Sequence, residues 1–327
     1  MLLWKSGQER AAPLDSLDAW TSCRIPEDEK RYMAHPTTVD HLLPGDHVCW
    51  TFDDHERHLS ALIRYLRGGL ERGEQVLYFT DTFLPDAFLA AAQAYGLEVR
   101  EPERTGQLQV TTAEESYLAG GTFDAERALA GWHTAIGEAR GQGYSALRVA
   151  ADMGWTVRAT PGVERLAWYE AQVNQIFSDG YAMALCCYDR RLFTSAELDR
   201  VGAAHPATAR AGAGSHEEWA PMLRIRRTFE GLALTGAADR SNSDALEATL
   251  RHVVADAHRI ADGAAPLVVD VADLTFADTA IARLLAGAVA AARGRLLLRG
   301  VRPTLHEMLS VIDPGQAHAR CVTGSTV

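Results

Sequence analysis

Residues 47–80 read HVCWTFDDHERHLSALIRYLRGGLERGEQVLYFT. The first six, HVCWTF, are a short apolar and aromatic run, which is typical of a buried strand. Leucine and isoleucine then recur at helical spacing as far as Leu70, and two aspartates stand just before them, where helix caps are common. QVLYFT (75–80) is a second apolar run. The stretch therefore predicts strand, helix and strand, the repeating unit of a parallel sheet.

The same alternation continues to residue 189. Further strands are expected at 108–112, 146–152 and 181–189, and further helices at 85–95, 124–140 and 162–178. Because these strands are continuous apolar runs, we expect helices to cover both faces of the sheet. The predicted fold class is therefore α/β, with a mainly parallel sheet.

The segment HPATARAGAGSHEEW (205–219) breaks this pattern, because it is rich in alanine, glycine and serine. We therefore predict a linker there and divide the chain into four parts. These are a poorly ordered tail (1–35), a first domain (36–208), the linker (209–221) and a second domain (222–327).

The second domain is predicted to be a smaller α/β unit. Its expected strands are 223–230, 231–236, 265–273 and 295–300, and its expected helices are 242–258, 278–292 and 303–311. About 100 residues is an ordinary size for one domain.

Length, composition and charge limit the class of protein. The chain has 327 residues, of which 47% are hydrophobic and 23% charged, as in globular proteins of two domains. The net charge of −11 argues against nucleic acid as the main partner, since phosphate binding needs a basic surface. No apolar run approaches the roughly 18 residues that cross a bilayer, and no signal peptide is recognisable. We therefore expect a cytoplasmic protein without a membrane partner.

The cysteines predict neither disulfides nor a metal site. They are odd in number and lack both C-x-x-C pairs and zinc-ligand spacing. The two adjacent ones are poorly placed to bridge each other, because neighbouring side chains on a strand point to opposite faces. The five are Cys23, Cys49, Cys186, Cys187 and Cys321.

A candidate ligand site follows from the strand ends. In an open parallel sheet, ligands bind beyond the carboxyl ends of the strands. A single aspartate there more often caps a turn, but a set of polar residues predicts a pocket rim. The predicted ligand-binding residues are His47 and Cys49, which share one face of the first strand, and Asp81, Asp152, Trp155, Asp189 and Arg190.

Six segments of the first domain resemble the MEDS domain, a sensory module of methanogens and methylotrophs named partly after a dichloromethane-responsive regulator. They are GDHVCW (45–50), GLERGEQVLYF (69–79), RVAADMGW (148–155), YEAQVNQIF (169–177), LCCYDRRLF (185–193) and AAHP (203–206). They occur in the family's order across about 36–208. The resemblance implies a RecA/circadian-clock-ATPase-like fold adapted to sense a small molecule.

The loop after the first strand departs from the ATPases of that fold. It reads TFDDHERH (51–58), where an NTPase needs Gly-x-x-x-x-Gly-Lys-Ser/Thr to wrap and neutralise phosphate. This loop has neither glycine nor lysine, and its two aspartates repel phosphate. We therefore expect no ATP cofactor and no enzyme activity, and the ligand stays unidentified.

Other candidate residues have simpler interpretations. His55 and His58 are spaced i, i+3 at the predicted start of a helix. This spacing more often marks a solvated first helical turn than a metal site. Glu170 lies on a mostly apolar helix, where it could pair with an arginine or contact a ligand, and a structural role is the simpler reading. His47 and Cys49 stand about 7 Å apart on a strand, too far for a nucleophile and its base.

The second domain contains LVVDVADLTFADTAIARLL (267–285), which predicts a buried strand, a turn and a helix that begins near Asp278. It resembles the STAS domain of anti-sigma-factor antagonists. The positions that match are Asp270, Thr275, Phe276, Asp278 and Thr279. LRIRRTFEGLALTGAAD (223–239), with Gly236 and Asp239, resembles the family's opening hairpin, and GRLLLRGV (294–301) its late strand.

This resemblance implies a switch at Thr279. It implies phosphorylation there by a serine kinase of the anti-sigma, HATPase type, and partner binding through Asp239, Asp278 and Thr279. This sequence departs from the family at the next two positions, where Ala280-Ile281 replaces a small Ser/Thr-Gly pair. The larger Ile281 is expected to hinder access of a kinase to Thr279. The simpler alternative is that Thr279 caps the helix.

The sequence thus favours a bacterial signal-transduction regulator. A sensory first domain binds a small molecule and alters how the STAS-type domain engages an anti-sigma factor. Two alternatives stay open: a degenerate RecA-like enzyme that uses Asp152 and Cys49, and a scaffold that does not switch. Whether the protein is a homodimer is also left open.

Overall fold

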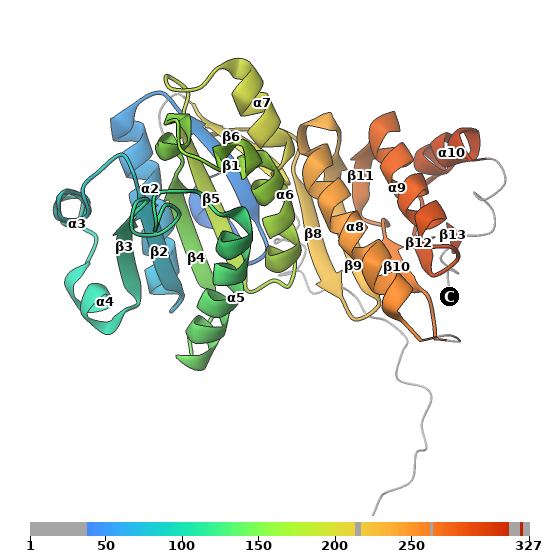
Figure 1. Ribbon diagram of the computed structural model, residues 1–327, viewed down its shortest axis with the longest axis horizontal. Coiled ribbons are helices and arrows are strands. Elements are labelled where there is room, and N and C mark those ends of the chain that lie inside the picture. Colours follow the sequence, from blue (N-terminus) through green and yellow to red (C-terminus); the bar gives the residue numbers. More distant parts are fainter. Residues whose placement is uncertain (1–37, 213–216, 262–263, 314–320, 323–327) are drawn as a thin grey trace, which may run out of the picture. The chain divides into compact units, whose positions relative to one another are not determined.

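The first domain is built on a mainly parallel sheet, as predicted (Figure 1). The computed structural model describes residues 38–212, 217–261, 264–313 and 321–322, so the predicted tail lies outside the described residues. The strands are β1 (His47–Phe52), β2 (Gln75–Thr80), β3 (Leu108–Thr112), β4 (Leu147–Asp152), β5 (Ala182–Asp189), β6 (Ala207–Ala211) and β7 (Glu217–Trp219). Their order is β3-β2-β4-β5-β1-β6-β7, and among them β7 alone is antiparallel to its neighbour.

Helices cover both faces of this sheet. They are α2 (His55–Glu71), α3 (Pro85–Ala94), α4 (Arg100–Thr105), α5 (Ala125–Gly141), α6 (Leu166–Phe177) and α7 (Ser195–Ala203), with 3-10 turns η1 (Val39–His41), η2 (Gly154–Val157) and η3 (Val163–Arg165). Alternate strand residues enter different cores. Trp50 and Cys187 pack with α2, whereas Cys49 and Cys186 pack with α5 and α6.

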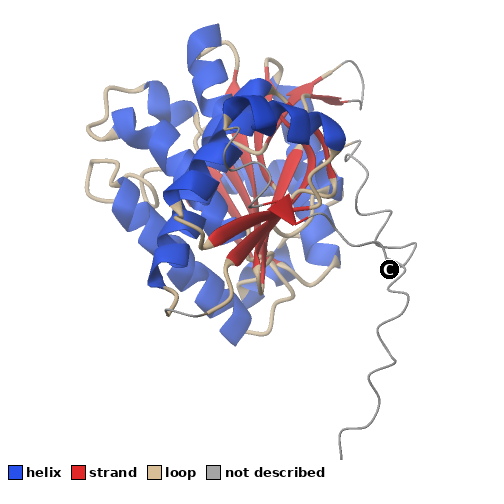
Figure 2. Cartoon of the chain, turned by 90° about the vertical axis from the view of Figure 1, so that its right-hand side faces the viewer, coloured by secondary structure: helices blue, strands red, loops and turns tan. Residues whose placement is uncertain are grey.

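The second domain has its own sheet, in the order β11-β9-β10-β12-β13 with β8 beside β9. The strands are β8 (Leu223–Thr228), β9 (Gly231–Ala238), β10 (Leu267–Asp270), β11 (Leu274–Ala277), β12 (Leu296–Arg299) and β13 (Cys321–Val322). The helices are η4 (Arg240–Asn242), α8 (Ser243–Arg259), α9 (Thr279–Ala291) and α10 (Pro303–Ile312). Figure 2 shows strands in the interior, with helices against them. This domain also matches its predicted α/β class.

We had predicted a linker at 209–221, but this segment contains paired strand residues. Ala209–Ala211 continue β6, and β7 pairs with them as an antiparallel strand. Trp219 packs against the core of the first domain, so apolar burial extends the sheet into this segment. The sequence analysis also missed α7, although Thr194 and Glu197 form a capping box at its start.

The two domains contact each other directly within residues 35–327, which form one compact unit. Helix α6 packs on α8, and three alanines, Ala171, Ala204 and Ala248, are buried together there. The carboxamide oxygen of Gln172 on α6 lies 2.9 Å from Nε2 of His252 on α8. Small side chains allow such close helix packing, so α6 of the first domain contacts the second domain directly.

No helix of the described segments has the length and apolar character that a membrane span requires.

Candidate functional site

A cavity of about 360 Å³ opens at the carboxyl edge of the first sheet, where parallel strands position ligands. We call it the edge cavity. Its lining residues are Phe52, His55, Asp81, Thr82, Gly154, Cys187, Asp189, Arg191 and Leu192. Of the predicted ligand-binding residues, Asp81 and Asp189 line it.

Arginines hold both carboxylates of the edge cavity. Arg191 donates from Nε and Nη2 to the two oxygens of Asp189, at 2.8 and 2.6 Å, and this pairing lowers the pKa of Asp189. Arg158 pairs with Asp81, whose pKa is raised by burial despite the opposing charge. His55 lies 2.7 Å from Arg191. The cavity therefore presents carboxylate, guanidinium and imidazole groups to a small polar ligand.

Asp152 lies beneath the edge cavity and does not line it. Its Oδ2 accepts hydrogen bonds from the backbone nitrogens of Asp81 and Thr82, at 3.2 and 2.9 Å, and from the Tyr78 hydroxyl at 2.8 Å. Its Oδ1 lies 3.1 Å from Nε2 of His58. Asp152 is 1% exposed, so it positions the loop that carries two of the lining residues.

We had predicted a solvated helical turn at His58, but this residue is not solvated. It is completely buried and stacks on Phe52, with ring centroids 4.0 Å apart and planes 3° apart. The hydrogen-bonding contact with Asp152 gives the buried imidazole the polar partner that it needs. His55, one turn earlier, is the histidine that reaches the edge cavity.

The start of α2 is already capped where a phosphate loop would bind phosphate. Oδ1 of Asp54 accepts hydrogen bonds from the backbone nitrogens of Glu56 and Arg57, both at 2.9 Å. The aspartate therefore occupies N–H groups that a phosphate would need. Its negative charge opposes phosphate binding at the same place.

The other predicted ligand-binding residues lie elsewhere. Trp155 is fully buried in the core beside Tyr117, and Arg190 is at the surface with Asp53, 3.3 Å away. His47 is the first residue of β1, at the opposite end from the cavity, and Cys49 is buried inside the sheet. The structure thus separates the predicted imidazole, thiol and indole from the carboxylates.

The thiols of the sheet are poor candidates for a nucleophile. Burial raises the pKa of Cys49, Cys186 and Cys187 above the ordinary thiol value, and nearby acidic groups add to this effect. A neutral thiol is a weak nucleophile at neutral pH. No observation on these groups favours a catalytic role.

A second group of polar side chains is buried on the α6 side of the sheet. We call it the histidine cluster; its members are His47, Glu170, Cys186 and His205. Oε2 of Glu170 lies 3.3 Å from Nε2 of His47 and 3.6 Å from Nε2 of His205. Burial lowers the pKa of His47 to about 4 and that of His205 to about 3, so both imidazoles are neutral at neutral pH. Glu170 therefore pairs with histidines rather than with an arginine.

The predicted partner-binding residues of the second domain lie at one edge of its sheet. Asp239 and Asp278 follow β9 and β11, which are parallel neighbours with Ala238 beside Ala277. Asp278 caps α9, since its Oδ1 accepts a hydrogen bond from the nitrogen of Ile281 at 2.9 Å. Thr279 is the first residue of the helix and is exposed, so it does not cap α9, contrary to the simpler alternative.

The capping geometry predicts different costs for two neighbouring substitutions. Asp278→Ala should lower the free energy of unfolding by about 1 kcal/mol, because the helix loses its side-chain cap. Thr279→Ala should leave it nearly unchanged, since its hydroxyl caps no backbone nitrogen. Urea unfolding of both variants measures the difference. Equal costs would contradict the assignment of the cap to Asp278.

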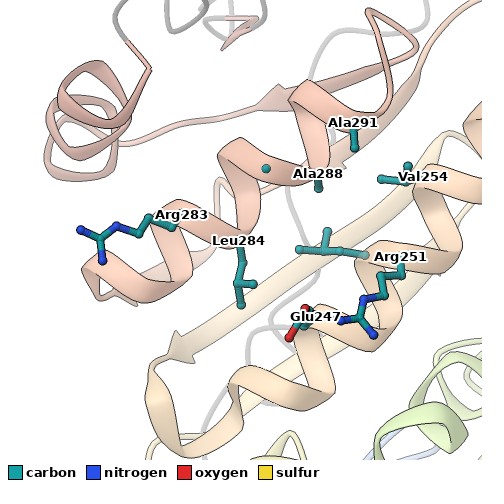
Figure 3. Close-up of a pocket in the computed structure, with 9 residues that line it drawn as sticks. Glu247, Arg251, Val254, Arg283, Leu284, Ala288 and Ala291 are labelled. Carbon is teal, nitrogen blue, oxygen red and sulfur yellow. Dashed lines mark hydrogen bonds and ion pairs between the residues drawn. The ribbon is translucent and has the colours of Figure 1, made fainter.

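A groove of about 280 Å³ runs between α8 and α9 (Figure 3). Figure 3 shows Val254 of α8 and Ala288 of α9 facing each other across it, with Leu284 on the same side of α9. Glu247 and Arg251 stand at its rim. The helix that Thr279 opens therefore carries an apolar surface along its length.

Comparisons with known proteins identify both domains. Residues 46–206 match the MEDS family model, the MEthanogen/methylotroph, DcmR Sensory domain. Residues 223–316 match the model of the Mlab STAS domain. No curated protein sequence matches the chain.

Two archaeal proteins are among the similar solved structures. One is the flagellar accessory protein FlaH from Methanocaldococcus jannaschii, at 9% identity over 59% of this chain and 90% of that chain, with a TM-score of 0.40. The other is a KaiC-like protein from Pyrococcus horikoshii OT3, at 9% identity over 58% and 89%, with a TM-score of 0.39. The two family matches confirm the predicted order, with a segment that matches the MEDS domain followed by one that matches the STAS domain.

Proposed function

We propose that this protein is a bacterial signal-transduction regulator that is not an enzyme and binds no ATP. Its MEDS domain binds a small polar molecule in the edge cavity, and its STAS domain engages an anti-sigma factor. The direct contact between the domains carries this proposal. Helix α6 supports the core of the sensory domain and also packs on α8 of the STAS domain.

The contact offers a physical route between the two domains. Gln172 on α6 is bonded to His252 on α8, and the amide of Asn242 donates to the Pro206 carbonyl at 3.3 Å. Arg224 of β8 also pairs with Asp46, just before β1, at 2.9 Å. A shift of α6 or of the turn after α7 therefore changes packing at α8, and α8 packs on α9.

Sensing is tested on the protein as purified. Native mass spectrometry should detect a bound small molecule, and its removal should change deuterium exchange in α8 and α9. Asp189→Asn with Arg191→Gln should lose the molecule, because the pair lines the edge cavity. A molecule retained at full occupancy by this variant would place the ligand elsewhere.

The output is tested at Thr279. Thr279→Glu should weaken binding to the anti-sigma kinase of the host by about tenfold or more, because added negative charge repels an acidic partner surface. The glutamine of Thr279→Gln has the size of glutamate without its charge, so this variant should bind the kinase like the wild type. Titration of each variant against purified kinase gives the affinities.

A parallel experiment incubates the wild type with the host's kinases and maps phosphate by mass spectrometry. The exposed hydroxyl at the start of α9 is where we expect it. Absence of phosphate from Thr279, together with equal binding by the glutamate and glutamine variants, would leave α9 without a switch.

A further inference from the structure

The histidine cluster brings four metal-binding atoms together inside the sensory domain. Nε2 of His47, Oε2 of Glu170, Sγ of Cys186 and Nε2 of His205 all lie within 4.8 Å of one another. The nitrogen–oxygen distances are 3.3 and 3.6 Å, the nitrogen–sulfur distance from His47 is 3.4 Å, and the oxygen–sulfur distance is 3.8 Å. Neighbouring ligand atoms around tetrahedral Zn²⁺ stand about 3.3–3.6 Å apart, from its usual bond lengths. Three of these four distances therefore fit tetrahedral zinc, and the oxygen–sulfur distance is slightly longer.

Hydrogen bonds fix both imidazoles with a free lone pair toward the centre of the cluster. Nδ1 of His205 lies 2.7 Å from the Val201 carbonyl, which can only accept, so Nδ1 carries the proton. Nδ1 of His47 lies 2.9 Å from Oδ1 of Asn174. The Asn174 amide nitrogen donates to backbone carbonyls, including that of Ala204 at 2.9 Å, so its oxygen is the acceptor. Both Nε2 atoms are then unprotonated and directed at the cluster.

One of the inward-facing atoms, Nε2 of His205, lacks a hydrogen-bond partner within the part of the chain that the structure describes, although the residue is completely buried. It lies 3.6 Å from an oxygen of Glu170, and these two electron-rich atoms repel each other unless a proton or a metal ion lies between them. An unsatisfied buried polar group costs about 1–3 kcal/mol. A shared cation removes that cost and the repulsion together.

The surroundings match those of bound metals. Metal-binding histidines usually donate their other ring nitrogen to an oxygen, as His47 and His205 do. The Tyr188 hydroxyl donates to Oε1 of Glu170 at 3.2 Å, which leaves Oε2 for the ion. One carboxylate and one thiolate also neutralise a divalent charge, which a buried site requires.

From this geometry we infer that His47, Glu170, Cys186 and His205 bind one zinc ion. Imidazole and thiolate ligands favour Zn²⁺ over Mg²⁺ and Ca²⁺, which prefer oxygen. Four protein ligands leave no open position, so the zinc is structural. The site is distinct from the edge cavity, and the inference does not rest on the proposed function.

The second buried group, His58, Asp152 and Cys187, does not make an equal case. It offers three ligand atoms, and both oxygens of Asp152 already have hydrogen-bonding partners. The carboxylate of Asp152 and Nε2 of His58 form a 3.1 Å pair, although Nδ1 of His58, like Nε2 of His205, has no hydrogen-bond partner among the described residues. The lone-pair conflict of the histidine cluster is therefore not repeated there.

The zinc would connect four separate segments at the domain contact. His47 begins β1, Glu170 lies on α6, Cys186 lies on β5, and His205 follows α7. The neighbours of two ligands touch the STAS domain: Ala171 and Ala204 pack with Ala248, and Pro206 accepts from Asn242. Zinc at this position would hold rigid the surface on which α8 packs.

The test measures zinc in the full chain after removal of any affinity tag. Inductively coupled plasma mass spectrometry should find about one zinc ion per chain after reconstitution with Zn²⁺, as expected for a structural site in which metal binding is coupled to folding. Cys186→Ser should lose most of it. Cys49→Ser is the matched control, because Cys49 is equally buried in the next strand and is paired in register with Cys186, yet is not one of the four ligands. It should keep about one ion.

Two further measurements keep the test decisive if Cys186→Ser does not fold. Tyr188→Phe should bind zinc about tenfold more weakly, since it removes a bond that orients Glu170. Co²⁺ added to the metal-free wild type should give the intense visible absorption of tetrahedral cobalt with a thiolate ligand. Zinc well below one ion per chain after reconstitution, or equal uptake by wild type and Cys186→Ser, would overturn the site and leave a proton-shared network instead.

Discussion

Arg148→Met should lower the free energy of unfolding by about 3 kcal/mol or more, the usual effect of breaking a buried ion pair. Arg148 is completely buried on β4 and donates from Nε to Glu74 at 2.5 Å. Its guanidinium also lies 4.5 Å from the centre of the Tyr65 ring. Without it, Glu74 keeps only a half-exposed partner, Arg72, at 3.0 Å. Glu74 is 3% exposed in the wild type, so its carboxylate would be left poorly compensated.

Urea unfolding measures the loss, and two controls interpret it. The double substitution Arg148→Met with Glu74→Leu should recover much of the stability, because it leaves no buried charge. Arg104→Met removes an exposed pair with Glu101 and should leave the midpoint unchanged. A single Arg148→Met variant as stable as the wild type would show that the pair contributes nothing to the fold.

Asp152→Ala should lower the free energy of unfolding by about 3–5 kcal/mol, since it leaves several buried donors without an acceptor. The Tyr78 hydroxyl, the His58 ring and the backbone nitrogens of Asp81 and Thr82 all bond to this carboxylate. The loop that lines the edge cavity should loosen as well.

Asp189→Asn is the matched control for this variant. It also changes an aspartate at a strand end, but the partner, Arg191, is half-exposed. Its cost should stay below about 1 kcal/mol. Equal losses for Asp152→Ala and Asp189→Asn in urea unfolding would contradict the positioning role of Asp152.

The same carboxylate gives stability a dependence on pH. Burial raises the pKa of Asp152, but the charge and hydrogen bond of His58 and the other donors outweigh this and hold the pKa below the ordinary 3.8. The contribution is therefore present above about pH 4 and is lost as the pH falls through the lower folded-state pKa. Asp152→Asn should be less stable at pH 7 and should lose less stability than wild type below pH 4. Parallel acid titrations of the two proteins would show the difference.

Much of the fold was readable from local patterns. The continuous apolar runs at 47–52 and 75–80 predicted buried parallel strands, because such runs need cover on both faces. TFDDHERH (51–58) excluded a phosphate loop from its residue types, and the structure adds that Asp54 fills the helix start. The change from strand β11 to helix α9 at Asp278 was also predictable from local sequence, whereas the alternative in which Thr279 caps the helix is wrong, because Asp278 makes the cap.

The position of the edge cavity could be predicted from the sequence, but the full set of residues that line it could not. The rule that ligands bind beyond strand ends picked out Asp81 and Asp189, which do line the cavity there, since strand ends can be read from the sequence. It could not reveal that Asp152 points under the loop, or that Trp155 turns into the core. Those outcomes depend on which way the chain turns after β4, which is set by packing. Arg191, which holds Asp189, was missed beside the predicted Arg190.

The sequence by itself determined the α/β alternation, the order of the two domains and the opposite facing of Cys186 and Cys187. These follow from periodicity and chain geometry, which act over a few residues. Tertiary structure alone decided that His47 meets Cys186, which lies 139 residues away, together with Glu170 and His205. Side chains so distant in sequence carry no spacing signal. Their encounter depends on β5 pairing with β1 and on α6 and α7 covering that face of the sheet.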